Sequence, residues 1–313
     1  MGTPDFAVES LRALVDSGYN VVAVVTMPDK PAGRGHQLQY SAVKQYALSV
    51  GLPLLQPERL KDEDFLAQLK SYNADLQIVV AFRMLPEVVW NMPRLGTFNL
   101  HASLLPQYRG AAPINWAIIN GDKESGVTTF FLKHEIDTGD VIFRDVVAID
   151  ENDTAGTLHD KLMLQGGDTV MRTVEAIVNG AVTALPQSEM YINESELRPA
   201  PKIFRDTCHI DWQGSVDSVY NFVRGMSPYP AAWCELVNAN DEAVALKVYA
   251  VSKEYVQHDK AAGTVVTDGK NYIKVAVEGG YVSLDEVQLA GKKRMPVADL
   301  LRGFSVEGIK CVK

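Results

Sequence analysis

The sequence predicts an α/β fold in two parts. Residues 1–187 are expected to form a Rossmann-like, doubly wound and mostly parallel sheet, and residues 205–313 a small C-terminal β-barrel of OB-like type. In the first part, short apolar runs alternate with helical patterns, which is typical of a parallel sheet covered on both faces. In the second part, alternating strands are separated by turns such as Asp268-Gly269. A small antiparallel barrel is the natural closure for such strands, with a sandwich as the alternative.

The first part begins with a helix signal. Thr3 can cap a helix, Pro4 suits its first position, Asp5 complements the helix dipole, and Gly18 ends the pattern. Strands are then expected at 20–26, 54–55, 75–81, 97–100, 126–132 and 141–147, and helices at 41–49, 63–69, 86–91 and 157–178. No strand precedes the first helix, although a Rossmann-like sheet places its first strand centrally. We therefore expect the natural chain to begin upstream of Met1.

A linker is predicted at residues 188–204, because periodicity is lost there while prolines and acidic residues accumulate. After it, a helix at 216–225 precedes strands at 243–249, 263–267, 272–277 and 281–284. The chain is thus expected to hold a catalytic domain at 1–187 and a second, barrel domain at 205–313.

Composition limits the class of protein. The 313 residues are 47% hydrophobic and 22% charged, without an apolar run of membrane-spanning length. The N-terminus lacks the basic and apolar pattern of a secretory signal. Three widely spaced cysteines, with no pair at metal-ligand spacing, predict reduced thiols in a cytoplasmic protein: Cys208, Cys234 and Cys311.

Charge is unevenly distributed. The net charge of −9 does not favour nucleic-acid binding. Residues 292–313, however, carry six basic residues against two acidic ones, a local charge of +4. That cluster is compatible with a phosphate-backbone partner and equally with a solvated charged tail.

The segment 96–113 carries the chemistry. Asn99 and His101 lie two residues apart at the end of a predicted strand, so their side chains point the same way, at the carboxyl edge where open α/β sheets bind ligands. An amide donor beside an imidazole suits a developing oxyanion. Asp137, in a turn between two later strands, could reach the same edge and favour a charged His101. The alternatives are a capping pair and an ordinary turn, but the long loop at 103–113 favours a site.

These residues match a known family. Asn-Leu-His-Ala-Ser-Leu-Leu-Pro-x-Tyr-Arg-Gly at 99–110, followed by Asp-Thr-Gly-Asp at 137–140, resembles the 10-formyltetrahydrofolate-dependent formyltransferases. The members that act on methionyl-tRNA are similar over nearly the whole chain, at residues 2–6, 28–35, 92–96, 200–203, 210–212 and 290–295.

The resemblance implies a site. Asn99, His101 and Asp137 would be the catalytic triad, and the folate co-substrate would lie against Ser103, Leu104, Leu105 and Pro106. The pterin would lie beside Arg83, Met84 and Leu85, where the chain departs from a commoner, one-residue-longer pattern that contains Tyr-Gly. No metal is implied; His134, Asp137 and Asp140 could mimic ligands but lie in a strand and turn.

The loop at 27–38 is too long and too rich in Gly and Pro for a simple connection. The resemblance favours tRNA contacts there over a mobile surface loop. Basic residues expected to contact tRNA are Lys30, Arg34, Lys202, Lys292, Lys293 and Arg294.

The expected activity is formyl transfer from 10-formyltetrahydrofolate to the α-amino group of methionine on initiator tRNA, for translation initiation. The expected partners are methionyl-tRNA and the folate, with no membrane and a monomeric state. The alternative is a folate-dependent formyltransferase that acts on a nucleotide-linked amino sugar. A purine-pathway formyltransferase would lack the second domain. A dinucleotide-binding dehydrogenase is disfavoured because no Gly-x-Gly-x-x-Gly motif occurs.

Overall fold

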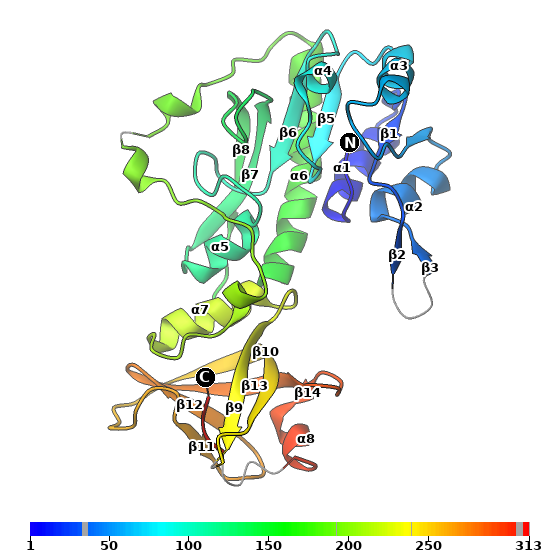
Figure 1. The fold of residues 1–313 in the computed structure, drawn as a ribbon. Helices are drawn as coiled ribbons and strands as arrows, with labels where there is room; N and C mark the ends of the chain where they lie inside the picture. Colours follow the sequence, from blue (N-terminus) through cyan, green and yellow to red (C-terminus); the bar gives the residue numbers. More distant parts are fainter. Residues whose placement is uncertain (33–36, 192, 239, 305–308, 313) are drawn as a thin grey trace. The chain divides into compact units, whose positions relative to one another are not determined.

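A computed structural model describes residues 1–32, 37–191, 193–238, 240–304 and 309–312, and the chain divides into two compact units (Figure 1). Unit 1 comprises Met1–Gly110, Ser125–Ala148 and His159–Ala200; unit 2 comprises Ala111–Glu124, Ile149–Leu158 and Pro201–Lys313. The division at residue 200 falls inside the predicted linker. Two short segments that were predicted for the first domain group with unit 2, and the domain boundaries themselves stay a prediction.

Unit 1 contains the predicted Rossmann-like sheet. Its strands are β1 (Val24–Val25), β4 (Leu54–Leu55), β5 (Gln77–Val80), β6 (Thr97–His101), β7 (Glu124–Phe131) and β8 (Val141–Ala148). β1 pairs in parallel with β4, and β5 with β6, whereas β7 is antiparallel to β6. Between β1 and β5 the backbone of Met1 and Gly2 bonds to both, through Gly2 N to Val25 O (3.0 Å) and Val80 N to Met1 O (2.9 Å). The mostly parallel sheet is confirmed.

The helices associated with this sheet are α1 (Phe6–Asp16), α2 (Ala42–Ser49), α3 (Glu63–Ser71), α4 (Glu87–Trp90) and the long α6 (Ala155–Val178). The carboxylate of Asp5 accepts a hydrogen bond from Phe6 N, so Asp5 caps α1 and the predicted start at Thr3-Pro4 is wrong. The α2 and α3 caps, Ser41 and Asp62, each accept from a backbone N–H three residues later.

The strand predicted at 20–26 is shorter in the structure, where only Val24–Val25 forms β1. A cavity of about 550 Å³ borders this region; it is lined by residues 19–25 and 72–78, together with Met1 and Gly2. Residues 20–23 face this cavity instead of a neighbouring strand. The expected upstream extension of the chain stays a prediction.

One face of the sheet is covered by α6, which runs alongside β5–β8 in Figure 1. Thr129 Oγ1 of β7 hydrogen-bonds Thr173 Oγ1 of α6 at 2.8 Å, and a Cβ on Gly166 of α6 would lie 2.7 Å from Leu100 Cδ2 of β6. Because side chains alternate along a strand, Asn99 and His101 project from the opposite face. The sheet therefore presents both to the loop that follows β6.

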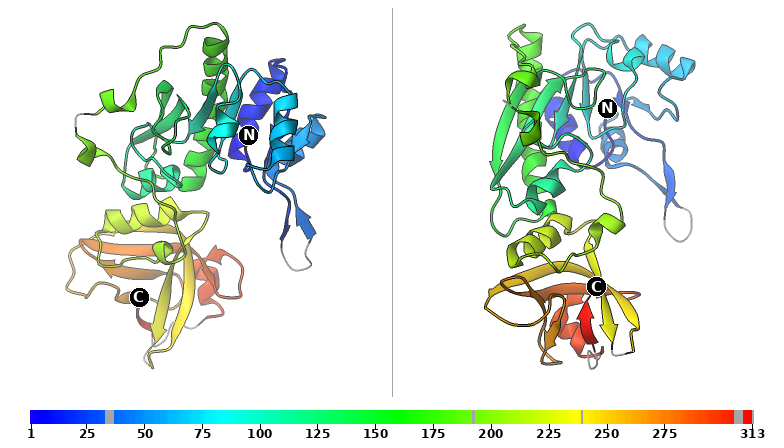
Figure 2. Two further views of the ribbon diagram at one scale, coloured as in Figure 1. Left: turned by 45° about the horizontal axis from the view of Figure 1, so that its top comes forward. Right: turned by 60° about the vertical axis from the view of Figure 1, so that its left-hand side comes forward.

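Unit 2 contains an antiparallel sheet, seen from two sides in Figure 2. Its elements are α5 (Pro113–Ile119), α7 (Val216–Met226), α8 (Val297–Leu301), β9 (Ala232–Asn238), β10 (Ala243–Tyr255), β11 (Val265–Thr267), β12 (Ile273–Val277), β13 (Gly280–Leu289), β14 (Met295–Pro296) and β15 (Ile309–Val312). The strand order is β11-β12-β13-β10-β9-β15, with β14 beside β13. Val312 N donates to Gly263 O at 2.9 Å, which returns β15 to the segment before β11. This closure is consistent with the predicted OB-like barrel.

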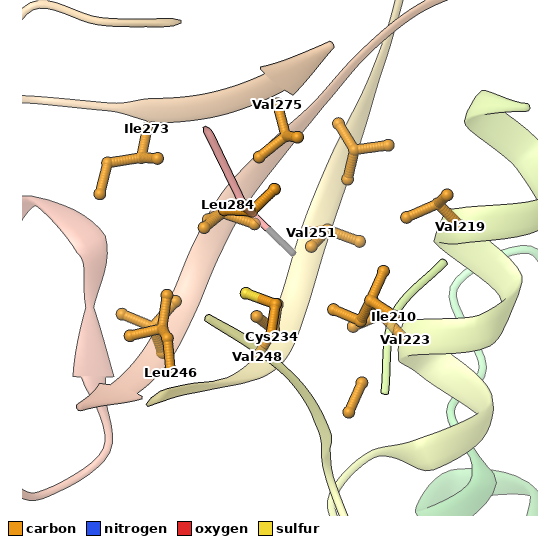
Figure 3. Close-up of a cluster of buried hydrophobic side chains, with 14 of the residues drawn as sticks. Ile210, Val219, Val223, Cys234, Leu246, Val248, Val251, Ile273, Val275 and Leu284 are labelled. Carbon is orange, nitrogen blue, oxygen red and sulfur yellow. The ribbon is translucent and has the colours of Figure 1, made fainter. Parts of the chain in front are cut away.

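The core of unit 2 is shared by the strands and by α7. Inward residues such as Cys234, Leu246 and Val275 pack with Val219 and Val223 of α7 (Figure 3). The alternation predicted parts of β10 and β13, which are longer than expected, and it missed β9 and β15. Short 3-10 turns at Gln187–Glu189, Glu194–Glu196 and Asp206–Cys208 occupy and follow the predicted linker.

Within the described ranges, no helix is both long enough and apolar enough to cross a bilayer.

Candidate active site

The structure brings together the triad predicted from sequence. His101 is the last residue of β6 and is 7% exposed. Its Nδ1 lies 3.8 Å from Oδ2 of Asp137, in the turn between β7 and β8. This distance allows an ion pair when His101 is protonated, but it is longer than a hydrogen bond. The sequence prediction that Asp137 reaches His101 is therefore correct in geometry, without a direct hydrogen bond.

The His101 ring is oriented by the backbone of Tyr108. His101 Nε2 lies 2.8 Å from the Tyr108 carbonyl oxygen. A carbonyl oxygen only accepts hydrogen bonds, so Nε2 carries a proton and donates it. Nδ1 is then the nitrogen that faces Asp137. Sequence reasoning did not identify this carbonyl, because a backbone contact leaves no signal in residue type.

The turn of Asp137 is held by three hydrogen bonds, of which two go to Asp137 itself and one goes to Gly139. Gly110 N donates to its Oδ2 at 3.0 Å, and Gln187 Nε2 donates to the carbonyl oxygens of Asp137 (2.8 Å) and Gly139 (2.9 Å). The φ angle of Asp137 is 56°, in the left-handed region that a residue with a side chain rarely adopts. Sequence reasoning missed Gln187, which lies 50 residues further along the chain.

The possible metal ligands beside Asp137 have other partners. His134 Nε2 lies 3.7 Å from Glu87 Oε1, and Asp140 Oδ1 lies 2.6 Å from Lys133 Nζ. In the ranges that the structure describes, no three His, Cys, Asp or Glu side chains are grouped so that they could hold a metal ion.

Asn99 supplies an unsatisfied polar atom. Its Oδ1 is buried and has no hydrogen-bond partner among the described residues. A buried acceptor without a partner costs about 1–3 kcal/mol, which a bound donor would recover. Asn99 and His101 share a strand face, so this acceptor belongs to the same site as the imidazole.

The loop after β6 is organised by its own residues. Ser103 Oγ donates to Gln107 O (2.7 Å), and Thr128 Oγ1 donates to Ser103 O (2.6 Å) and accepts from Leu105 N (3.1 Å). Leu105 packs with Phe130. Of the predicted folate-lining residues in this loop, Ser103, Leu105 and Pro106 are therefore buried in the protein, while Leu104 is partly exposed.

The second predicted folate segment lies at another cavity. Arg83 donates to the carbonyls of Pro57 and, at 2.8 Å, Glu58, while Met84 is 75% exposed and Leu85 is buried. An open cavity of about 590 Å³ is lined by Leu60, Lys61, Arg83, Met84, Pro86, Glu87 and Val88. The lining of this cavity includes neither the triad nor residues 103–106.

The predicted tRNA loop is anchored at its base. The backbone of Lys30 lies in β2 (Lys30–Ala32), which pairs with β3 (Gln37–Gln39), while Arg34 lies outside the described residues. At the base, Lys44 Nζ donates to Asp29 Oδ2 (2.5 Å) and Gln56 Oε1 (2.9 Å). Lys44 and Gln56 hold the pKa of Asp29 below its usual range.

The other predicted tRNA contacts lie in unit 2. Lys202 is exposed, with its Nζ 5.3 Å from the ring centroid of Phe204, and Lys292 and Lys293 are exposed in the turn between β13 and β14. Arg294 pairs with Glu286 and lies 4.4 Å above the Tyr249 ring. Its charge is therefore partly balanced within the unit, unlike the exposed lysines beside it.

Comparison with known proteins shows the family of the chain. Residues 1–174 match the formyl transferase family, and residues 202–305 match the formyl transferase C-terminal domain. The methionyl-tRNA formyltransferases of Bacteroides thetaiotaomicron and Bacteroides fragilis are 66% and 64% identical to the chain, over 97% of its length and 94% of theirs. A solved N-formyltransferase from Helicobacter canadensis, in complex with folinic acid and dTDP-3-aminofucose, has a similar fold: its TM-score is 0.62 at 19% identity, over 94% of this chain and 97% of that one. The chain therefore belongs to the formyl transferase family, which includes the methionyl-tRNA formyltransferases.

Proposed function

We propose that this protein transfers the formyl group of 10-formyltetrahydrofolate to the α-amino group of methionine carried on initiator tRNA, for translation initiation. The names of its relatives support this substrate, and their identity extends over both units. The observation that carries the proposal is the meeting of His101 and Asp137, beside the unpaired amide oxygen of Asn99. The enzyme would act in the cytoplasm, as a monomer.

Asn99 and His101 stabilise charge in this proposal. The α-amine attacks the formyl carbon on N10 of the folate, a C–N bond forms, and the carbonyl oxygen becomes an oxyanion. Asn99 Nδ2 and the Nδ1 proton of charged His101 donate to that oxygen, because Nε2 is already committed to Tyr108. The free Asn99 Oδ1 accepts an N–H of the attacking amine.

Asp137 handles the proton. Its carboxylate lies 3.8 Å from His101 Nδ1, where it can pair with the protonated imidazole, and it takes a proton from the attacking amine directly or through water. The oxyanion then re-forms the carbonyl as the bond from the formyl carbon to N10 breaks. N10 takes up the proton that Asp137 removed from the attacking amine and leaves as a neutral amine, and the formyl group remains on methionine. The chain needs no covalent intermediate for these steps.

Substrate contacts follow the sequence prediction. The folate lies against the loop of Ser103, Leu104, Leu105 and Pro106. In this loop the partly exposed side chain of Leu104 contacts the folate, while the other three residues set the shape of the loop. The pterin lies beside Arg83, Met84 and Leu85. Residues 1–187 act as the catalytic domain and residues 205–313 as a tRNA-binding domain. The tRNA is contacted by Lys30, Arg34, Lys202, Lys292, Lys293 and Arg294.

The test is formyl transfer from 10-formyltetrahydrofolate to methionyl-tRNA by wild type, His101→Ala and Asn99→Ala. Removal of one such donor should lower kcat by about 10²–10³-fold. His159→Ala is the control, because its ring contacts Asp5, Phe6 and Asp160 instead. A nucleotide-linked amino sugar is assayed in parallel. Formylation of the sugar but not of methionyl-tRNA, or full activity of His101→Ala, would contradict the proposal.

A further inference from the structure

We propose that Gln187 is a positioning residue that holds the turn carrying Asp137 in its reactive place. This inference rests on the proposed function, because it assigns Gln187 to the same site. The side chain of Gln187 is 2% exposed and makes four hydrogen bonds, the full number that its oxygen and amino group offer. A buried amide with every bond satisfied is rigid.

Arg109 fixes which way the amide of Gln187 points. Nε and Nη2 of Arg109 lie 3.0 and 2.6 Å from the same Gln187 atom, Oε1. A guanidinium only donates, so that atom is the oxygen. The amino group then faces the carbonyl oxygens of Asp137 and Gly139, which only accept. Only one orientation of the Gln187 amide therefore pairs every donor with an acceptor.

The turn at Asp137 is a segment that needs such support. Asp137 has a φ angle of 56°, a conformation that is unfavourable for a residue with a Cβ and persists only where neighbours enforce it. Gln187 holds the backbone of this residue from one side. Gly110 N–H holds its carboxylate, through Oδ2, from another.

Both contacts depend on one short segment. The side chain of Arg109 donates hydrogen bonds to Gln187, and the backbone N–H of the next residue, Gly110, donates to the Asp137 carboxylate. The segment is itself fastened, because Ala200 N donates to Arg109 O at 2.8 Å and Tyr108 N donates to Arg198 O at 2.7 Å. Gln187 therefore links the turn of Asp137 to the loop whose Tyr108 carbonyl orients His101.

Two substitutions separate the parts of this contact. Gln187→Met keeps the length of the side chain and removes all four hydrogen bonds. Gln187→Glu keeps an acceptor for Arg109, but it places a second oxygen against the carbonyls of Asp137 and Gly139. Gln68→Met, on the exposed side of α3, is the matched control.

The measurement is steady-state formylation of methionyl-tRNA, with thermal unfolding of each variant. Both Gln187 variants should lose about 10- to 100-fold in kcat, while KM for both substrates stays within about two-fold, because Gln187 orients Asp137 without touching substrate. In an Asp137→Ala background, Gln187→Met should change the remaining kcat by less than about two-fold, since the two residues act as one unit.

Three results would overturn the inference: wild-type kcat in both variants, the same fold-loss with and without Asp137, or failure of both variants to fold, which would make Gln187 purely structural. Wild-type enzyme that does not formylate methionyl-tRNA would instead contradict the proposed function. The two failures are therefore distinguishable.

Discussion

Gly139→Ala should disable the enzyme by moving Asp137. An added Cβ at this position would lie 1.6 Å from the carbonyl oxygen of Phe131 and 3.0 Å from Phe130 Cδ2. Cβ contacts below 3.0 Å are essentially never seen. The added Cβ must therefore move from 1.6 Å to at least 3.0 Å from the Phe131 oxygen, and the turn must shift by at least 1.4 Å to allow this. Phe131 cannot yield easily, because it lies in β7 and its N–H bonds to Asp140 O at 3.0 Å.

A shift of this size is large beside the 3.8 Å that separates His101 Nδ1 from Asp137 Oδ2. A misplacement of about 1 Å can cost about 100-fold in rate, so kcat should fall by about 100-fold or more. Overpacking of this kind should also lower the free energy of unfolding by about 1–3 kcal/mol. Formyl transfer to methionyl-tRNA under saturating substrates measures the first effect, and urea unfolding measures the second.

Gly303→Ala is the matched control, because its added Cβ meets no atom of the described residues within 4 Å. That variant should keep wild-type kcat and stability. Gly139→Ala with a kcat within about two-fold of wild type would refute the argument, since the turn could then move without consequence for the rate.

Two further predictions concern unit 2. Arg224→Met should lower the free energy of unfolding by about 2–3 kcal/mol in urea titrations, because Arg224 is 6% exposed and donates to Asp153 O at 2.8 Å. The control is Arg302→Met at an exposed position, which should change the free energy of unfolding by less than about 0.5 kcal/mol. Equal effects of the two substitutions would contradict the burial argument. Burial raises the pKa of the Cys234 thiol to about 12. Mass spectrometry should therefore find Cys234 unalkylated by iodoacetamide at about pH 8 until the protein is unfolded. Rapid alkylation of the folded protein would show instead that the thiol is accessible.

Local signals in the sequence predicted most elements. Gly18, which follows the end of α1 with a φ angle of 75°, acts within one helical turn, so residue type alone indicated this helix end. Strand lengths were less predictable, because a strand extends only where a neighbour pairs with it. The apolar run at 20–26 shows this: its end pairs with β4, while its beginning faces a cavity.

The site divides in the same way. The spacing of Asn99 and His101 sets their common direction on β6, and the family motif pointed to Asp137; their catalytic roles stay predictions. The carboxylate of Asp137 approaches the imidazole of His101 as predicted, at 3.8 Å, which is longer than a hydrogen bond. The carbonyl of Tyr108 takes the other ring nitrogen.

The sequence by itself determined the fold class and the family, because periodicity and a dense motif are written in residue types at short range. Only the tertiary structure decided that Gln187 and Arg109 hold the turn of Asp137, and that the Tyr108 carbonyl orients the His101 ring. The physical reason is that backbone carbonyls and long-range amide contacts depend on where the folded chain passes, which no local pattern specifies.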